Sequence, residues 1–375
     1  NPNPDSPNCP GSVRINITNA AINGNHTFEG GTVANLYPLV RGMYNKRKDE
    51  INAFGWKNEF FVGNGIKLVA DASWSKAKRD ELSLENNTQL IPGTNTSLAN
   101  LDTLNIAYSS NGFSQLDPGR DYSDPTKLYL RGTIYGSGYG KVPKVEDELK
   151  SFKLMASFPS SSDWLSGIDV GFNYADREKE KHQPEGNINV GAQGDTTIAS
   201  DLQYGLVDLG FAGVGLTPSW NVPGAVARYM TFSPSEDSAG YLIAKTWKVN
   251  ETISTGFVRG NLDGEWGSVP VRGNIGLQIQ HVDQSSDGRA FLPPNIVRPY
   301  TKGKKYTDVL PSLNLAFSLA DDQTLRVALA RQVARPRVDQ MRASLDFGVD
   351  KNNGKPGGST GNAELDPWRA NAFDI

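Results

Sequence analysis

The sequence predicts an all-β fold, an antiparallel transmembrane β-barrel in which each wall strand has one apolar and one polar face. Three observations support this prediction: apolar and polar residues alternate with a period of two, tight turns alternate with long loops, and glycine and aromatic residues are abundant. The alternation is clearest in residues 309–334, VLPSLNLAFSLADDQTLRVALARQVA. Successive strand side chains point to opposite faces, so this segment is expected to form a hairpin with lipid on one face and water on the other.

The polar face of this hairpin indicates a wet interior rather than a dry core. In the first arm the odd positions from Leu313 to Leu319 are apolar, and in the second arm Val327 and Leu329 continue the apolar set. The positions between them are small or polar and include Arg326. In the dry core of a β-sandwich an inward-facing arginine would be a costly buried charge, whereas the water-filled lumen of a membrane barrel keeps it hydrated.

The same pattern recurs along the chain and predicts the remaining wall strands. Paired arms are expected at residues 54–62 and 66–74, 148–158 and 165–177, and 247–262 and 271–282, and a last strand begins near Trp368. Short connections at 63–65, 159–163 and 263–268 join the arms of each pair. The first of them, Gly63-Asn64-Gly65, is a strong hairpin signal because Asn and Gly tolerate positive φ.

Longer segments separate these hairpins, at residues 80–147, 178–240, 284–304 and 336–367. They are rich in Asn, Asp, Gly, Ser and Pro, which favours loops. Short periplasmic turns and long extracellular loops are typical of outer-membrane barrels. The pattern yields about nine wall strands, an odd number that predicts part of a larger barrel, because single-chain bacterial barrels have even strand numbers.

Composition agrees with a strand-rich membrane protein and argues against other classes. The 39 Gly, 13 Tyr, 15 Phe and 7 Trp suit turns, strands and interfacial aromatic belts. A hydrophobic share of 37% and a mean hydropathy of −0.46 fit spanning strands, in which only alternate residues need to be apolar. The net charge of −3 offers no basic surface to nucleic acid. The single Cys9 excludes an internal disulfide, three scattered histidines disfavour a metal site, and no cofactor is indicated.

Three segments carry a family resemblance: VPVRGNIGLQIQHVDQSSDG (269–288), YTDVLPSLNLAFSLADDQTLRVALARQVARPRVDQMRAS (306–344) and GNAELDPWRANAFDI (361–375). Together they resemble TonB-dependent outer-membrane receptors, most closely the branch abundant in xanthomonads, caulobacters and marine gammaproteobacteria. The upstream pieces DEINAFGWKNEFFV and GIDVGFNYADREKEK fit the same branch. The resemblance covers about two thirds of the chain, and the long loops are unmatched.

The resemblance implies energised import across the outer membrane of a Gram-negative bacterium. Members of this family have a large barrel occluded by an N-terminal plug, and the TonB complex pulls on a short box that precedes the plug. Their substrates are ferric siderophores, cobalamin, haem or, often in this branch, oligosaccharides. No plug, TonB box or closing strands are recognised in residues 1–375, which are therefore expected to form a partial barrel domain that reaches TonB through a plug absent from this sequence.

Candidate binding residues come from the loops and from the lumen side of the strands. Sugar recognition needs flat aromatic faces and side chains that hydrogen-bond hydroxyl groups, whereas iron chelates or haem favour cationic clusters or histidine. The loops offer the first set, and the predicted ligand-binding residues are Arg120, Asp121, Tyr135, Tyr139, Tyr204 and Trp220. Strand parity predicts lumen-facing positions, where the plug or the ligand could be contacted, for Arg272, Asn274, Gln278, Gln280 and Arg326.

An oligosaccharide is the first expected ligand, and an iron siderophore or haem is the alternative cargo of the same kind of receptor. A soluble secreted all-β carbohydrate-binding or hydrolytic protein would share the strands and aromatics, but its loop lengths would vary irregularly. A passive porin, which has no plug, is a third alternative. Catalysis is not expected, because Asp321-Asp322 lies in a turn and neither a nucleophile elbow nor a phosphate-binding loop is found.

Overall fold

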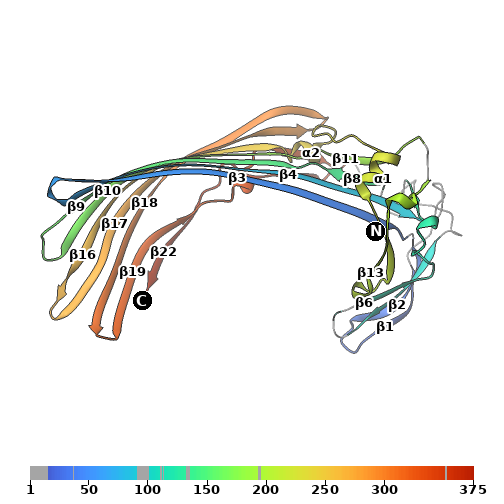
Figure 1. The fold of residues 1–375 in the computed structure, drawn as a ribbon, viewed down its shortest axis with the longest axis horizontal. Coiled ribbons are helices and arrows are strands. Elements are labelled where there is room, and N and C mark those ends of the chain that lie inside the picture. Colours follow the sequence, from blue (N-terminus) through green and yellow to red (C-terminus); the bar gives the residue numbers. More distant parts are fainter. Residues whose placement is uncertain are drawn as a thin grey trace. The chain divides into compact units, whose positions relative to one another are not determined.

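The computed structural model describes residues 16–36, 38–90, 101–109, 112, 114–131, 136–192, 196–350 and 353–375. Strands dominate these residues, and most strands are joined as antiparallel hairpins (Figure 1). The chain divides into two compact units. Unit 1 consists of residues 1–46, 81–142 and 184–235, and unit 2 of residues 47–80, 143–183 and 236–375.

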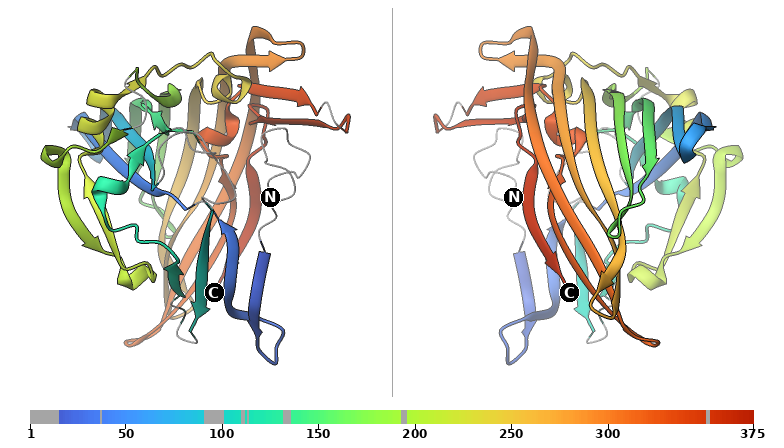
Figure 2. Two further views of the ribbon diagram at one scale, coloured as in Figure 1. Left: turned by 90° about the vertical axis from the view of Figure 1, so that its right-hand side faces the viewer. Right: turned by 90° about the vertical axis from the view of Figure 1, so that its left-hand side faces the viewer.

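A wall sheet that follows the order of the chain makes up most of unit 2, and residues 40–46 of its first strand and 81–89 of its second belong to unit 1. Its strands are β3 (Val40–Val62), β4 (Ile66–Gln89), β9 (Lys144–Pro159), β10 (Leu165–His182), β16 (Trp247–Trp266), β17 (Val269–Leu292), β18 (Ile296–Ala320), β19 (Gln323–Ala334) and β22 (Trp368–Asp374). β3 pairs with β4, and the others follow as β4-β9-β10-β16-β17-β18-β19-β22. Figure 2 shows the yellow-to-red strands β16 to β19 side by side. These nine strands confirm the predicted antiparallel all-β wall.

Short turns join the wall strands in pairs at residues 63–65, 160–164, 267–268 and 321–322. Asn64 and Gly65 have φ angles of 63° and 73°, which accounts for the Asn-Gly sequence of the first turn. The predicted connection at 263–268 is present but shorter, at residues 267–268, because β16 continues to Trp266 and stays in register with β17. Asp263 faces Arg272 across the two strands, and this pairing keeps a polar stretch in the ladder.

The predicted loop at residues 284–304 is also wrong. β17 and β18 stay paired from Val271 opposite Phe317 to Leu292 opposite Ile296, and only residues 293–295 connect them. The composition of this stretch is misleading because the hairpin here extends past the apolar part of the wall. One of its faces is buried, but that face carries polar side chains such as Gln284 and Ser286, so apolar alternation is absent.

One face of the wall sheet carries a continuous band of exposed apolar side chains. The register aligns Leu154, Phe172, Gly256 and Ile279 across four neighbouring strands. On β10 the band runs over residues 168–174, roughly 20 Å at ~3.3 Å per residue, close to the ~25 Å apolar band of an outer-membrane barrel. Band residues between 37% and 54% exposed are Phe152, Leu154, Phe158, Val170, Phe172, Tyr174, Val258, Ile275, Leu277, Ile279, Val309, Leu325 and Leu329. This face is suited to lipid contact.

Unit 1 is formed mainly by the long connections between wall strands, and it has its own small sheets. β1 (Asn16–Ile22), β2 (Phe28–Leu36), β5 (Asp102–Tyr108) and β6 (Ser114–Pro118) form one sheet in the order β1-β2-β5-β6. β8 (Gly138–Lys141) pairs with β4 and β11 (Glu185–Val190), and β11 pairs with β15 (Met230–Phe232). β13 (Gln203–Asp208) and β14 (Leu216–Trp220) form a separate hairpin, and β7 (Tyr129–Leu130) pairs with β12 (Thr196–Thr197).

A compact core holds unit 1 together. Leu130, Ile188 and Ala225 are fully buried in it, and Trp220 is 6% exposed. The helix α1 (Val222–Tyr229) packs into this core, and Asn221 caps it by accepting a hydrogen bond from the Gly224 amide at 3.0 Å. Three 3₁₀ turns lie at Pro125–Lys127, Ser200–Leu202 and Gly210–Ala212. The connections predicted as loops are therefore long but folded.

The remaining elements of unit 2 lie before β16 and between β19 and β22. They are the short helix α2 (Gly240–Ile243), the 3₁₀ turn η6 (Val338–Met341) and the strands β20 (Leu345–Val349) and β21 (Pro356–Thr360). β20 pairs with β21 and, in parallel, with the outer end of β17. No helix in the described part of the chain is long and apolar enough to cross a membrane.

Candidate functional site

The face of the wall sheet opposite the apolar band is polar, and many of its charges are paired across neighbouring strands. Asp169 accepts hydrogen bonds from Arg259 Nε at 2.9 Å and Asn261 Nδ2 at 3.0 Å, and its side chain is 6% exposed. Arg177 donates to Asp147 with Nη2 at 2.7 Å from Oδ2. Because lipid contacts the apolar face, this polar face lines the interior of the barrel.

The register places the five predicted lumen residues, Arg272, Asn274, Gln278, Gln280 and Arg326, together on the polar face. Several of them bond to the adjacent strand. Arg272 Nε lies 3.3 Å from Asp263 Oδ1, and Asn314 Nδ2 donates to Asn274 Oδ1 at 3.2 Å. These contacts are cross-strand pairs that stabilise the wall.

We call residues 335–350 and 353–367, between β19 and β22, the inner segment, and parts of it around residues 338–344 and 363–366 dock on the polar face. Val338 and Met341 pack against Trp247 and Val249 of β16 in a buried apolar cluster. Met341 is fully buried. Trp247 and Val249 share strand parity with Arg259, so this contact is made on the interior side of the wall.

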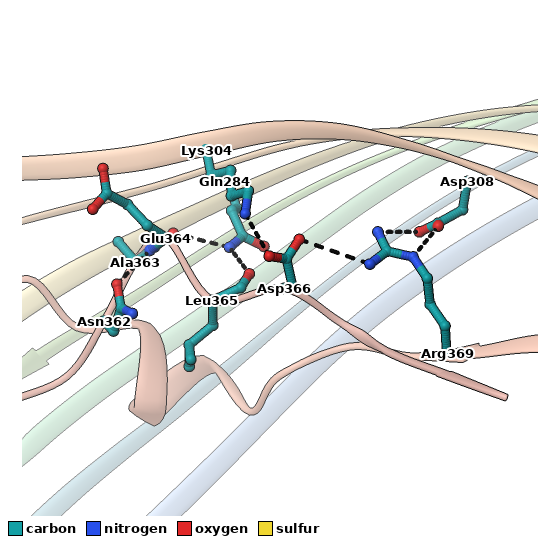
Figure 3. Close-up of polar contacts among 9 residues, drawn as sticks. All are labelled: Gln284, Lys304, Asp308, Asn362, Ala363, Glu364, Leu365, Asp366 and Arg369. Atoms are coloured by element: carbon teal, nitrogen blue, oxygen red, sulfur yellow. Dashed lines mark hydrogen bonds and ion pairs between the residues drawn. The ribbon is translucent and has the colours of Figure 1, made fainter.

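Hydrogen bonds fix the backbone of the inner segment to β17. Ser286 Oγ accepts from the Ala343 amide at 2.8 Å. Gln284 is 1% exposed, and its Nε2 donates to the carbonyl oxygens of Ala363 and Leu365, each at 2.9 Å (Figure 3). A polar side chain of the wall thus satisfies backbone groups of the inner segment.

A chain of alternating charges continues this contact into β22. Lys304 Nζ donates to Asp366 Oδ2 at 2.6 Å, Asp366 lies 3.7 Å from Arg369 Nη1, and Arg369 pairs with Asp308 of β18 (Figure 3). The hydrogen bond from Lys304 holds the pKa of Asp366 below its ordinary value. The side chain of Asp308 is 2% exposed, so its charge depends on Arg369 for compensation.

These residues of the inner network were not predicted from the sequence. Gln284 and Asp308 have the same parity as Gln280 and Asn314, so strand alternation carried a signal for their face. Their partners, at positions such as Asp366, come from a segment that lacks alternation. No sequence pattern indicates where such a segment folds.

The predicted ligand residues that the structure describes belong to unit 1, and two of them are engaged in its interior. The indole Nε1 of Trp220 donates to Asn86 Oδ1 at 3.1 Å inside the core. Tyr139 is half-buried, and its hydroxyl donates to Glu185 Oε2 at 2.8 Å. Trp220 is therefore placed to support the loops rather than to contact a ligand.

The other predicted ligand residues lie nearer the surface of unit 1. Tyr204 on β13 is 70% exposed and adjoins Gln203, which pairs with Trp220. Arg120 and Asp121 follow β6, and the side chain and amide of Ser123 donate to Asp121, which lowers the pKa of that carboxyl group. Tyr135 lies outside the described residues. The described ranges contain no group of three or more His, Cys, Asp or Glu residues arranged to hold a metal ion.

Comparison with known proteins identifies one family. Residues 79–375 match the family model described as TonB dependent receptor-like, beta-barrel. The match covers more than half of the chain and includes every wall strand from β9 to β22. Neither the curated proteins nor the solved structures include a match to this chain.

Proposed function

The chain belongs to the TonB-dependent receptor β-barrel family, and from this membership we propose that it imports a neutral oligosaccharide into the periplasm. Receptors of this family are transporters of the bacterial outer membrane that act with TonB and a ligand. The exposed apolar band and the polar interior agree with this location. A soluble secreted protein would have buried the band, so this alternative is excluded.

The choice of a neutral ligand is supported by charge pairing on the interior face. Arg177, Arg259, Arg335 and Arg369 each pair with a carboxylate. A polyanionic ligand needs cations without such partners, whereas a neutral sugar needs mixed donors and acceptors. The interior supplies this mixture through amides and carboxylates between the arginines.

Loop residues of unit 1 are proposed to make the first contacts with the ligand. Among the described members of the predicted set Tyr204 has the most exposed aromatic ring, and such a ring can stack on the apolar face of a sugar. Arg120, Asp121 and Tyr139 supply hydrogen-bonding groups in the same unit. Trp220 contributes by holding the β13–β14 hairpin against the core.

The proposal is tested by calorimetry on the full-length receptor in detergent, with neutral oligosaccharides, ferric siderophores and haem as ligands. Submicromolar binding of a neutral oligosaccharide supports it. Tyr204→Ala is expected to weaken that binding about tenfold, as loss of a stacking contact predicts. Tyr108→Ala is the matched control, because Tyr108 is 51% exposed in the same unit. If only an iron chelate or haem binds, the proposal of an import function stands, and the choice of an oligosaccharide as the ligand is overturned.

A further inference from the structure

We propose that the lipid-facing side of unit 2 binds a phosphate-bearing lipid of the outer leaflet, with an acyl chain in an apolar groove and the phosphate on Arg331. This inference goes beyond ligand import, since it concerns the outside of the wall. It rests on three observations: the groove, its position in the apolar band, and the charge at its end.

The groove has a volume of about 810 Å³ and crosses neighbouring wall strands. Its lining includes Ile168 of β10, Ile275 of β17 and Leu313 of β18. Gly260 of β16 stands between Ile168 and Ile275 in the cross-strand register, and it lines the groove as well. Because glycine has no side chain, the wall is hollowed between the two isoleucines.

The groove is continuous with the surface that contacts lipid. Ile275 pairs with Leu313, and Leu313 pairs with Leu329, so these side chains share the face of the apolar band. In the membrane this face is surrounded by hydrocarbon, and the chain available to fill an apolar hollow there is a lipid acyl chain.

The positively charged side chain of Arg331 lies at one end of the groove. Arg331 follows Leu329 by two residues on β19, is exposed, and lines the groove together with Asn371, its partner on β22. Within the described ranges no acidic side chain pairs with Arg331, in contrast to Arg259 on the interior face. A guanidinium group on the lipid face is costly unless it reaches the headgroup layer or an anion.

The strand direction assigns the leaflet. β19 starts at the short turn 321–322, on the periplasmic side, and Arg331 lies near its other end. The guanidinium group therefore reaches the headgroups of the outer leaflet. Phosphate is the anion that its planar donors bind best there, in a bidentate arrangement, and Asn371 adds a further hydrogen-bonding group.

The test measures phosphorylated lipid retained by the full-length receptor after extensive detergent washing, by phosphorus analysis and native mass spectrometry. Arg331→Gln removes the phosphate contact, and Gly260→Leu fills the groove. A Cβ atom at Gly260 would meet only the flexible end of Leu165, at 3.1 Å, and Ile275 at 3.5 Å or beyond. Each change is expected to lower lipid retention about tenfold, as loss of a charge-assisted contact or of an acyl-chain site predicts. Arg331→Lys should restore part of it.

Matched controls separate this site from general lipid contact. Gly256→Leu adds the same side chain to β16 on the same face, in open space outside the groove lining. Arg298→Gln removes another exposed arginine, which does not line the groove. Both should retain lipid as the unaltered receptor does. Unchanged retention in Arg331→Gln, or equal loss in all variants, would overturn the proposal.

A second measurement tests the leaflet. Purified phosphorylated glycolipid of the outer leaflet, added to delipidated receptor, should raise its melting temperature, and Arg331→Gln should abolish that shift while keeping the fold. Phosphatidylglycerol should raise the melting temperature less. An equal or larger effect of phosphatidylglycerol would overturn the assignment to an outer-leaflet lipid.

Discussion

Adjacent residues of β19 experience different solvents. Val327 pairs with Leu315 in the apolar band, and Ala328 pairs with Asn314 on the interior face. Val327→Arg should destabilise the receptor by about 2–4 kcal/mol near the bilayer midplane, whereas Ala328→Arg should cost less than about 1 kcal/mol. Equilibrium unfolding in urea from lipid vesicles measures both. Equal costs would contradict the assignment of the two faces.

Burial separates two aromatic residues that the sequence grouped together as ligand contacts. Trp220 is 6% exposed, and its ring fills the space above Gly42, where a Cβ atom would lie 2.5 Å from Trp220 Cζ2. Trp220→Ala should cost about 3–5 kcal/mol through the cavity it leaves. Tyr204→Ala should change stability by less than about 0.5 kcal/mol. Hydrogen exchange of the backbone amides of unit 1 measures the stability change in each variant. A large loss of protection in Tyr204→Ala would contradict the assignment of Tyr204 to the surface.

At the scale of elements, the inner segment depends on close backbone approach to β17. A Cβ atom at Gly288 would lie 2.7 Å from the Ser344 amide nitrogen and 2.9 Å from its Cα. Gly288→Ala should therefore displace residues 338–344 and speed their hydrogen exchange. Gly256→Ala, where nothing lies within 4 Å of the added atom, is the control. Unchanged protection in Gly288→Ala would show that the segment does not dock as described.

The contact of the inner segment with Lys304 also has a predicted pH dependence. The pKa of Asp366 is lowered in the folded state, so its contribution is present above its ordinary pKa of about 3.9 and is lost as pH falls through the lowered value. Protection factors for residues 361–367 should be constant from about pH 5 to 8 and fall only below about pH 4. Asp366→Asn should abolish this dependence. Loss of protection near pH 6 would implicate another group.

At the scale of the whole molecule, the family and the amphipathic wall together predict which ends of the wall strands face the periplasm. The short turns lie on the periplasmic side, and the long connections lie outside. Ser268→Cys and Asp322→Cys, placed in two short turns, should react with an impermeant maleimide only after the outer membrane is permeabilised. Lys355→Cys, at an exposed site before β21, should react on intact cells. A Cys9→Ser background removes the native thiol, and the reverse labelling pattern would invert the topology.

The sequence by itself determined which side chains of the wall strands lie on the apolar face and which lie on the polar face. Strand parity is a local property, because a side chain's face depends only on its position in the pleat. Leu313, Val327 and Arg326 could therefore be assigned to faces without knowing any distant partner. The tight turn at Asn64 was predicted for the same reason, since its positive φ is set by the residue and its neighbour.

The tertiary structure decided what depends on residues far apart in the chain. Gln284 donates a hydrogen bond to the carbonyl oxygen of Ala363, and Trp247 packs against Met341, yet no sequence period or motif links these positions. Trp220 is a core residue because its loop folds with the segments around Asn86. The part of β17 after residue 283 pairs with β18 and buries polar side chains such as Gln284 and Ser286, so its composition resembles that of a loop. The positions of these residues depend on backbone pairing and burial, which composition does not encode.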